Sequence, residues 1–301
     1  MNDGDAARPD ARSLIARMLD PHSWKSWDEP PRDRAEPGSA YAAELARVRA
    51  TTGYDESVVT GEGTLDGRRV AVVACEFSFL AGSIGVAATE RLVRAVERAT
   101  AERLPLLAAP ASGGTRMQEG ALAFTQMVKI TAAVATHRAA GLPYVVYLRH
   151  PTTGGVLASW GSLGHVTAAE PGALIGFLGP RVFESLHGYP FPQGVQVAEN
   201  LYAHGLVDAV VSAEDARTMA IRALDVLCAP REGLEPGREP EEAAEPVPAW
   251  EAITRSRRDD RPGVHDLLEF GARDVTPLQG TGTGERDSRL LLALARFGAA
   301  P

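Results

Sequence analysis

Apolar and polar residues alternate in blocks along the middle of this 301-residue chain. Residues 58–74 are strongly apolar at both ends and are interrupted by Asp66-Gly67, a pair typical of the tight turn in a β-hairpin. We therefore expect two antiparallel strands joined at this turn.

After the predicted hairpin, helical and strand patterns take turns. Apolar residues at helical spacing occupy 86–102 and 117–140, and the second stretch carries Phe124, Met127, Val128 and Thr131 on one face. Short apolar runs typical of buried strands follow each helix, and further pairs continue to Leu227. Alternation of this kind predicts an α/β fold with parallel strands covered by helices.

The two ends of the chain differ from this middle part in their composition and in their pattern of apolar residues. Residues 1–52 have helical tendency broken by prolines, and residues 229–248 are acidic and proline-rich, as solvated linkers are. We expect a partly helical, loosely attached lead-in over 1–52, the α/β domain over 53–228, a linker over 229–248 and a short C-terminal segment over 249–301.

Composition narrows the class of protein. A net charge of -8 argues against a nucleic-acid partner, and the two cysteines, Cys75 and Cys228, are too few for a disulfide framework or a cysteine-ligated zinc site. No apolar run approaches the roughly 20 residues of a membrane span. These features predict a cytoplasmic protein without a membrane or metal.

Two glycine pairs stand where a strand gives way to a helix. Gly113 and Gly114 follow one predicted strand, and Gly154 and Gly155 follow the next. Glycines let a ligand approach the backbone, and amides from two converging loops can stabilise an oxyanion. The alternatives are a plain strand-to-helix turn at the first loop and helix capping by Thr152 or Thr153 at the second.

Three longer motifs contain or follow these loops. They are Ser-Gly-Gly-Thr-Arg-Met-Gln-Glu (112–119), Pro-Thr-Thr-Gly-Gly-Val (151–156) and Glu-Pro-Gly-Ala-Leu-Ile-Gly-Phe-Leu-Gly-Pro-Arg-Val (170–182). In this order and spacing they resemble the carboxyltransferase β subunit of bacterial acetyl-CoA carboxylase. The resemblance covers about 53–227 and implies the crotonase-like ββα superhelix of that family.

The resemblance implies carboxyl transfer from carboxybiotin to an acyl-CoA, giving malonyl-CoA for fatty acid biosynthesis if the substrate is acetyl-CoA. Biotin is then carried on a separate biotin carboxyl carrier protein. Gly113, Gly114, Gly154 and Gly155 are the implied oxyanion hole, with Arg116 and Glu119 bracing the helix start. The implied substrate-binding residues are Arg116, Gly82, Thr153 and Gly179.

Two departures from the family pattern change what we expect. The four-cysteine zinc ribbon typical of the family is missing from this chain, so zinc is not carried over. Residues 249–301 resemble the opening of the family's α subunit. We therefore expect an oligomer in which a separate α-type chain completes the site.

Two other functions stay open from the sequence. One is the β-type subunit of a malonate decarboxylase, which shares the fold. The other is a non-catalytic partner subunit that binds CoA without turnover.

Overall fold

The computed structural model describes residues 8–229, 247–258, 260–279, 284, 287 and 289–297. The chain divides into two compact units, one formed by Met1–Ile221 with Leu278–Leu292 and the other by Arg222–Pro277 with Ala293–Pro301. Most of the predicted linker, residues 230–246, lies outside the described residues. The predicted domain boundaries stay predictions.

The predicted hairpin is confirmed. Strands β2 (Val58–Leu65) and β3 (Arg68–Cys75) pair antiparallel along their whole length. Asp66 and Gly67 between them both have positive φ, 51° and 75°, which is the backbone of the tight hairpin turn that this pair favours.

The central sheet of the first unit continues from this hairpin in parallel fashion. Its strand order is β1-β2-β3-β4-β5-β7-β9, and β3 through β9 run parallel, as predicted. The additional strands are β1 (Lys25–Ser26), β4 (Leu106–Ala109), β5 (Tyr144–Leu148), β7 (Val166–Ala169) and β9 (Ala209–Val210).

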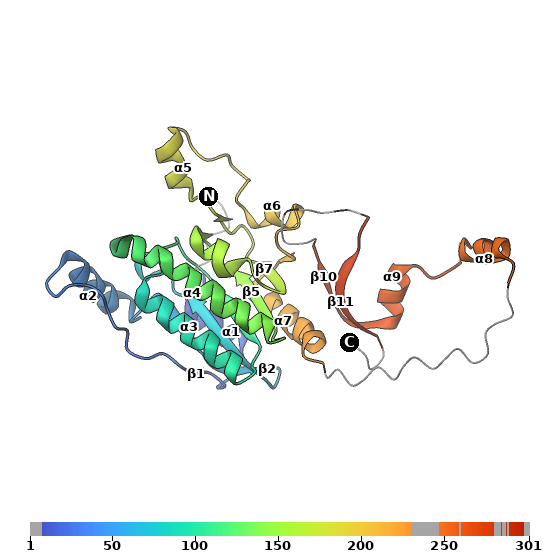
Figure 1. The fold of residues 1–301 in the computed structure, drawn as a ribbon, viewed down its shortest axis with the longest axis horizontal. Coiled ribbons are helices and arrows are strands. Elements are labelled where there is room, and N and C mark those ends of the chain that lie inside the picture. Colours follow the sequence, from blue (N-terminus) through green and yellow to red (C-terminus); the bar gives the residue numbers. More distant parts are fainter. Residues whose placement is uncertain are drawn as a thin grey trace. The chain divides into compact units, whose positions relative to one another are not determined.

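Successive side chains along a strand point to opposite faces of a sheet. Both faces of this sheet are apolar, and helices cover both of them. On one face, α3 (Val86–Ala101) and α4 (Gly120–Ala139) lie side by side (Figure 1) and enclose one row of strand residues. That row includes Val73, Leu106, Tyr144 and Val146. On the other face, α1 (Ala11–Met18) and the start of α7 (Ala213–Leu227) face the alternate row, which includes Val72, Leu107, Val145 and Tyr147.

The expectation of a loosely attached lead-in is wrong. Leu14 and Ile15 of α1 are only 1% and 3% exposed, and β1 extends the central sheet by pairing with β2. The next helix, α2 (Ala40–Thr52), begins at Ser39, whose hydroxyl accepts from the Ala42 amide, and ends at Gly53 in the left-handed conformation. The prolines between these elements separate ordered pieces and do not mark a mobile tail.

Several predicted elements are shorter than their patterns suggested. The helix expected from Met117 starts as a 3-10 turn, Met117–Glu119, and α4 proper begins at Gly120. A second, two-stranded sheet joins β6 (Thr152–Thr153) to β8 (Ile175–Gly176) in parallel. Between and after these lie a π-helical turn, Leu157–Gly161, and the helices α5 (Pro180–His187) and α6 (Ala198–Ala203).

The second unit is small and mixed. It contains α8 (Ala249–Ser256), α9 (Val264–Asp266) and a π-helical turn, Leu267–Gly271, followed by β10 (Ala272–Leu278), which pairs with β11 (Leu292–Phe297). Throughout the ranges that the structure describes, in either unit, no helix combines the length and apolar character needed to cross a bilayer.

Candidate functional site

The two glycine loops meet at one edge of the central sheet. The first follows β4 and the second follows β5, and these parallel neighbours end on the same side. Ser112 and Thr152 form a parallel bridge, in which the Ser112 amide donates to the Pro151 carbonyl at 2.6 Å and the Thr153 amide donates to the Ser112 carbonyl at 2.9 Å. The predicted convergence of the loops is therefore present.

Glycine is favoured where the loops touch. Gly154 and Gly114 both have positive φ, 64° and 113°, a region that side chains disfavour. A Cβ at Gly154 would lie 3.4 Å from the Gly114 Cα, and a Cβ at Gly114 would lie 3.8 Å from the Thr153 carbonyl oxygen, which are ordinary van der Waals contacts. The backbone conformation, more than a lack of space, therefore favours glycine at both positions.

Three of the four predicted glycine amides are engaged within the protein. The Gly113 amide donates to the Ala81 carbonyl at 2.9 Å, and the Gly114 amide donates to the Ser112 hydroxyl at 3.0 Å. The Gly154 amide is shared between the carbonyls of Gly176 and Phe177, at 3.2 and 3.0 Å. These amides hold the loops in shape.

Two neighbouring amides have no acceptor among the described residues: those of Gly155 and Thr115. Gly155 opens the helical turn after the second loop, where amides lack intrahelical partners. A Cβ at Gly155 would lie 3.8 Å from the Thr115 Cγ2, so the two residues are side by side, and both are half-buried. Thr115 is a candidate that the sequence pattern missed, since a backbone donor leaves no side-chain signal.

Arg116, the next residue, turns its side chain into the protein. It is 1% exposed and forms a two-pronged ion pair with Glu56, which is fully buried; one prong is 3.0 Å and the other joins Nη2 to Glu56 Oε1. Nη2 also donates to the Ser83 carbonyl at 2.7 Å. Burial works to lower the pKa of Arg116, but the hydrogen bonds and charge of Glu56 outweigh it and hold the pKa above its usual value.

Glu119 ties the loop to two helices. One carboxylate oxygen accepts from the Val86 amide at 2.7 Å and thereby caps α3, while the other accepts from the Tyr41 hydroxyl at 2.6 Å. Burial and this hydrogen bond to Glu119 raise the pKa of Tyr41. The Arg116 Nη1 lies 3.8 Å away from Glu119. Both residues thus brace the turn that presents the Thr115 amide.

Of the remaining predicted contact residues, Gly82 and Thr153 contact the loop backbones. Gly82 packs so tightly on the first loop that a Cβ there would collide with the Ala111 carbonyl. Thr153 is buried in the small sheet opposite Gly176, and Gly179 starts α5 with open space around it. His150, two residues after β5, accepts at Nδ1 from the Leu174 amide at 3.0 Å.

Side-chain chemistry is sparse at this edge. Burial is the main cause that raises the pKa of the Cys75 thiol to about 11, which keeps it protonated and unreactive at neutral pH. Within the part of the chain that the structure describes, no three His, Cys, Asp or Glu side chains gather as a metal site would require. The backbone amides of the loops are the candidate donors for chemistry.

Several known proteins are similar in sequence to this chain. A family model for the carboxyl transferase domain matches residues 10–286. A probable biotin-dependent acyl-coenzyme A carboxylase beta3 subunit of Mycobacterium tuberculosis is 62% identical over 285 residues, covering 94% of this chain and 57% of the relative. The acetyl-coenzyme A carboxylase carboxyl transferase subunit beta of Sinorhizobium medicae is 47% identical over 187 residues, 62% of each chain.

A solved structure confirms the fold. The crystal structure of transcarboxylase 12S matches with a TM-score of 0.72 at 24% identity, covering 97% of this chain and 55% of that one. The predicted α/β crotonase-like fold is thereby confirmed. The chain spans less than two thirds of the length of each of these three relatives. With the family model matched over most of its length, the chain belongs to the carboxyl transferase domain family.

Proposed function

We propose that this chain is the β-type carboxyltransferase subunit of a biotin-dependent acyl-CoA carboxylase. It would transfer a carboxyl group to the α-carbon of an acyl-CoA. Membership of the carboxyl transferase domain family and the 62% identity to a mycobacterial acyl-CoA carboxylase subunit support this class of reaction. Carboxybiotin on a separate carrier protein supplies the carboxyl group.

The observation that carries the proposal is the pair of unengaged amides at Thr115 and Gly155. Removal of the α-proton from an acyl thioester moves negative charge onto the thioester oxygen. Two fixed amide donors at that oxygen stabilise the charge without reorganising, which is how backbone oxyanion holes lower a barrier. The amides of Gly113, Gly114 and Gly154 then shape the hole, with Gly155 as the donor among the four predicted glycines.

Arg116 and Glu119 act in this proposal as positioning residues. Arg116 is buried against Glu56, and Glu119 caps α3, so neither side chain faces the half-buried amides. Their role is to fix the backbone at Thr115, where displacement of a donor by about 1 Å can cost a large factor in rate.

Acetyl-CoA, with malonyl-CoA as product, is the acyl substrate that the sequence motifs favour. The mycobacterial relative is named for acyl-coenzyme A in general, so the acyl group is an outcome of the assay. The proposed partners are a biotin carboxyl carrier protein and an α-type chain. Identity to the acyl-CoA carboxylase subunit favours this function over a malonate decarboxylase.

The proposal is tested by replacing Gly155. The nearest neighbours of a Cβ there would be side-chain atoms, Met127 Cγ at 3.3 Å and Thr115 Cγ2 at 3.8 Å, so Gly155→Val should fold yet cover both free amides. Carboxyl transfer between malonyl-CoA and biotin should fall about 100-fold to 1000-fold, the usual loss for one oxyanion donor. The measurement is made with this chain alone and with a candidate α-type chain added, and it is repeated with methylmalonyl-CoA.

Ala158→Val is the matched control, because it adds the same side chain one turn later at an exposed position. Its activity should equal that of the parent chain. If circular dichroism shows that both variants are folded and Gly155→Val is as active as Ala158→Val, the proposed oxyanion hole is contradicted. Absence of transfer from the parent chain in every mixture would contradict the proposed function itself.

A further inference from the structure

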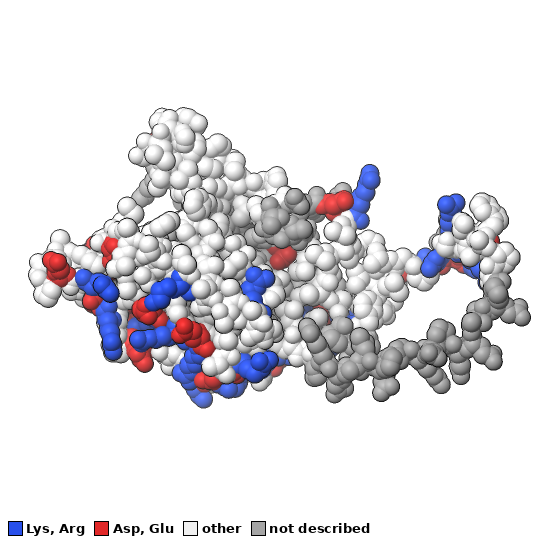
Figure 2. Space-filling view, in the orientation of Figure 1, with Lys and Arg blue, Asp and Glu red and all other residues white. Residues whose placement is uncertain are grey.

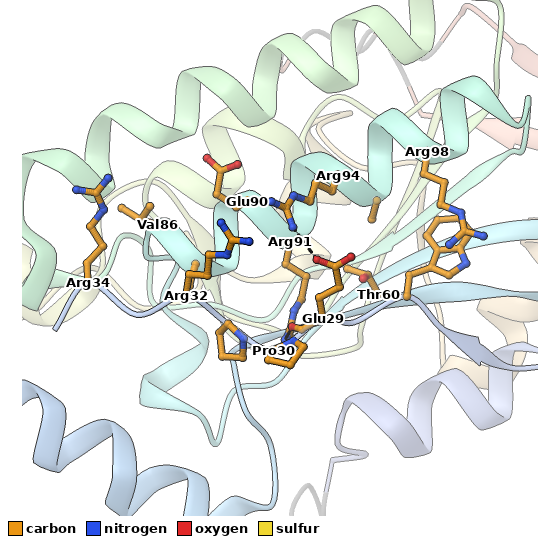
Figure 3. A pocket seen from close by; sticks show the side chains of 14 residues that line it. Glu29, Pro30, Arg32, Arg34, Thr60, Val86, Glu90, Arg91, Arg94 and Arg98 are labelled. Atoms are coloured by element: carbon orange, nitrogen blue, oxygen red, sulfur yellow. Dashed lines mark hydrogen bonds and ion pairs between the residues drawn. The ribbon is translucent and has the colours of Figure 1, made fainter.

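A concave site of the first unit is lined by none of the residues of the two glycine loops. It is a cavity of about 420 Å³ between residues 27–34 and the outer side of α3 (Figure 3). Val86, Glu90, Arg94 and Arg98 line it from α3 at a spacing of four residues, which places them along one stripe of the helix. We call it the arginine pocket.

The charge of the arginine pocket is opposite to that of the chain. Its lining contains five arginines, which are Arg32, Arg34, Arg91, Arg94 and Arg98, against the two glutamates Glu29 and Glu90. The whole chain has a net charge of -8. In Figure 2 blue and red side chains gather over the part of the first unit that contains α2 and α3. The pocket therefore concentrates positive charge on an acidic protein, as anion sites do.

Arg91 forms part of the wall of the arginine pocket. Arg91 is 8% exposed and forms a two-pronged pair with Asp55, at 2.9 and 2.7 Å. Its guanidinium also donates to the Glu29 carbonyl at 2.6 Å, which holds the segment after β1 against α3. Pro30 and Pro31, whose φ angles are fixed by their rings, continue that segment.

Arg32 and Arg34 remain available to a ligand, whereas the Arg98 guanidinium pairs with the Glu102 carboxylate at 2.8 Å and stacks over the Trp27 ring. Arg32 and Arg34 are exposed and make no ion pair or hydrogen bond among the described residues. Arg94 pairs at 2.9 Å with the Glu29 carboxylate, whose side chain is 75% exposed, and such pairs contribute little. Figure 3 shows the Arg32 guanidinium pointing toward α3 near Arg94, with Arg34 and Arg98 at opposite ends of the pocket.

We propose that the arginine pocket binds a small polyphosphate ligand, such as the phosphate chain of a nucleotide. Arginine presents planar pairs of N–H donors that match phosphate oxygens. Cations spread along an elongated pocket suit several linked phosphates better than one small anion. The volume lies in the range of small-molecule sites, about 300 to 1000 Å³. The site is separate from the thioester hole and does not depend on the proposed function.

Isothermal titration calorimetry tests the proposal with inorganic triphosphate, ATP and CoA as probes. We expect binding by the parent chain and at least tenfold weaker binding by the Arg32→Ala/Arg34→Ala variant, since each removes charge-assisted hydrogen bonds. Arg47→Ala, which removes one arginine at an exposed position on α2 outside the pocket, is the control and should bind like the parent.

The probes also distinguish the sources of the ligand. Tighter binding of ATP than of triphosphate would identify a nucleotide site, and an equal loss of CoA affinity in the double variant would assign the pocket to the nucleotide end of CoA. The proposal is overturned if triphosphate does not bind, if inorganic phosphate, titrated in the same way as a fourth probe, binds equally well, or if Arg47→Ala weakens binding as much as the double variant.

Discussion

Arg116 and Glu56 form an ion pair that is almost wholly excluded from water. Arg116 directly follows Thr115, whose amide is a proposed donor. Removing two charges from water costs several kcal/mol, and the pair repays this only while both partners are present. Ser83 and Ser57 supply the further hydrogen bonds that the guanidinium needs. The ion pair therefore fixes the position of the first glycine loop.

Loss of the Glu56 carboxylate should be strongly destabilising. Glu56→Ala leaves the Arg116 charge buried without its partner, so we expect the free energy of unfolding in urea to fall by about 3 to 5 kcal/mol. Asp33→Ala, which breaks the partly exposed pair with Arg49, should cost at most about 1 kcal/mol. Similar losses in the two variants would show that burial does not set the strength of the Glu56 pair.

Sequence reasoning located the loops but not all of their donors. Gly114 and Gly154 were predictable, because paired glycines between a strand and a helix mark a close backbone approach. The free amide of Thr115 was not, since every residue except proline carries one and only the fold decides which is unengaged. Glu56 was missed because it lies 60 residues from Arg116 in sequence.

At the scale of elements, buried strands and long helices followed their patterns, whereas short elements did not. Strand β8 covers only Ile175–Gly176, because it pairs with the two-residue strand β6 and the preceding Leu174 bridges to Val197. In α4 the predicted apolar face is split: Met127 is buried, but Phe124 and Val128 are 64% and 72% exposed. Periodicity identifies an apolar face and does not say what covers it.

His137 joins the ends of α3 and α4. Its Nε2 lies 3.3 Å from the Pro143 carbonyl, which only accepts, and its Nδ1 lies 3.0 Å from the Thr100 hydroxyl. Burial lowers the pKa of His137, and the same cause lowers the pKa of His150 and His165.

Stability should therefore fall as the solution is acidified. Below a pH of about 6.5 the unfolded chain binds protons that the folded chain refuses, so the free energy of unfolding decreases until the lowered folded pKa is reached. One histidine contributes at most about 1.4 kcal/mol per pH unit. Urea unfolding between pH 7.5 and 5.5 should show a shallower slope for His137→Gln than for the control His204→Gln, which changes an exposed histidine. Identical slopes would contradict this role for His137.

At the scale of the whole molecule, the first unit has a buried hydrophobic core and also exposes several large apolar side chains to solvent. The sheet is covered on both faces, yet Met117, Phe124 and Val128 near and on α4 and Val182 and Leu186 on α5 are more than half exposed. Figure 2 shows the α5 projection as white on the visible face. Apolar side chains gathered in this way are typical of interaction surfaces.

We expect α4 to contribute to the interface with the proposed α-type chain. Replacing Phe124 and Val128 by serine removes apolar contacts without touching the core, since both side chains face solvent in the isolated chain. The dissociation constant for the α-type chain, measured by analytical ultracentrifugation, should rise at least tenfold, as buried aromatic and aliphatic anchors usually contribute about 1 to 2 kcal/mol or more. Leu206→Ser, at another exposed apolar position, is the control and should leave the constant unchanged.

If the Phe124→Ser/Val128→Ser variant binds as tightly as the parent, the exposed face of α4 does not contribute to the interface. Weaker binding with intact thermal stability would instead link the split face of α4 to assembly, and would explain why a helix beside the glycine loops keeps large apolar residues in water.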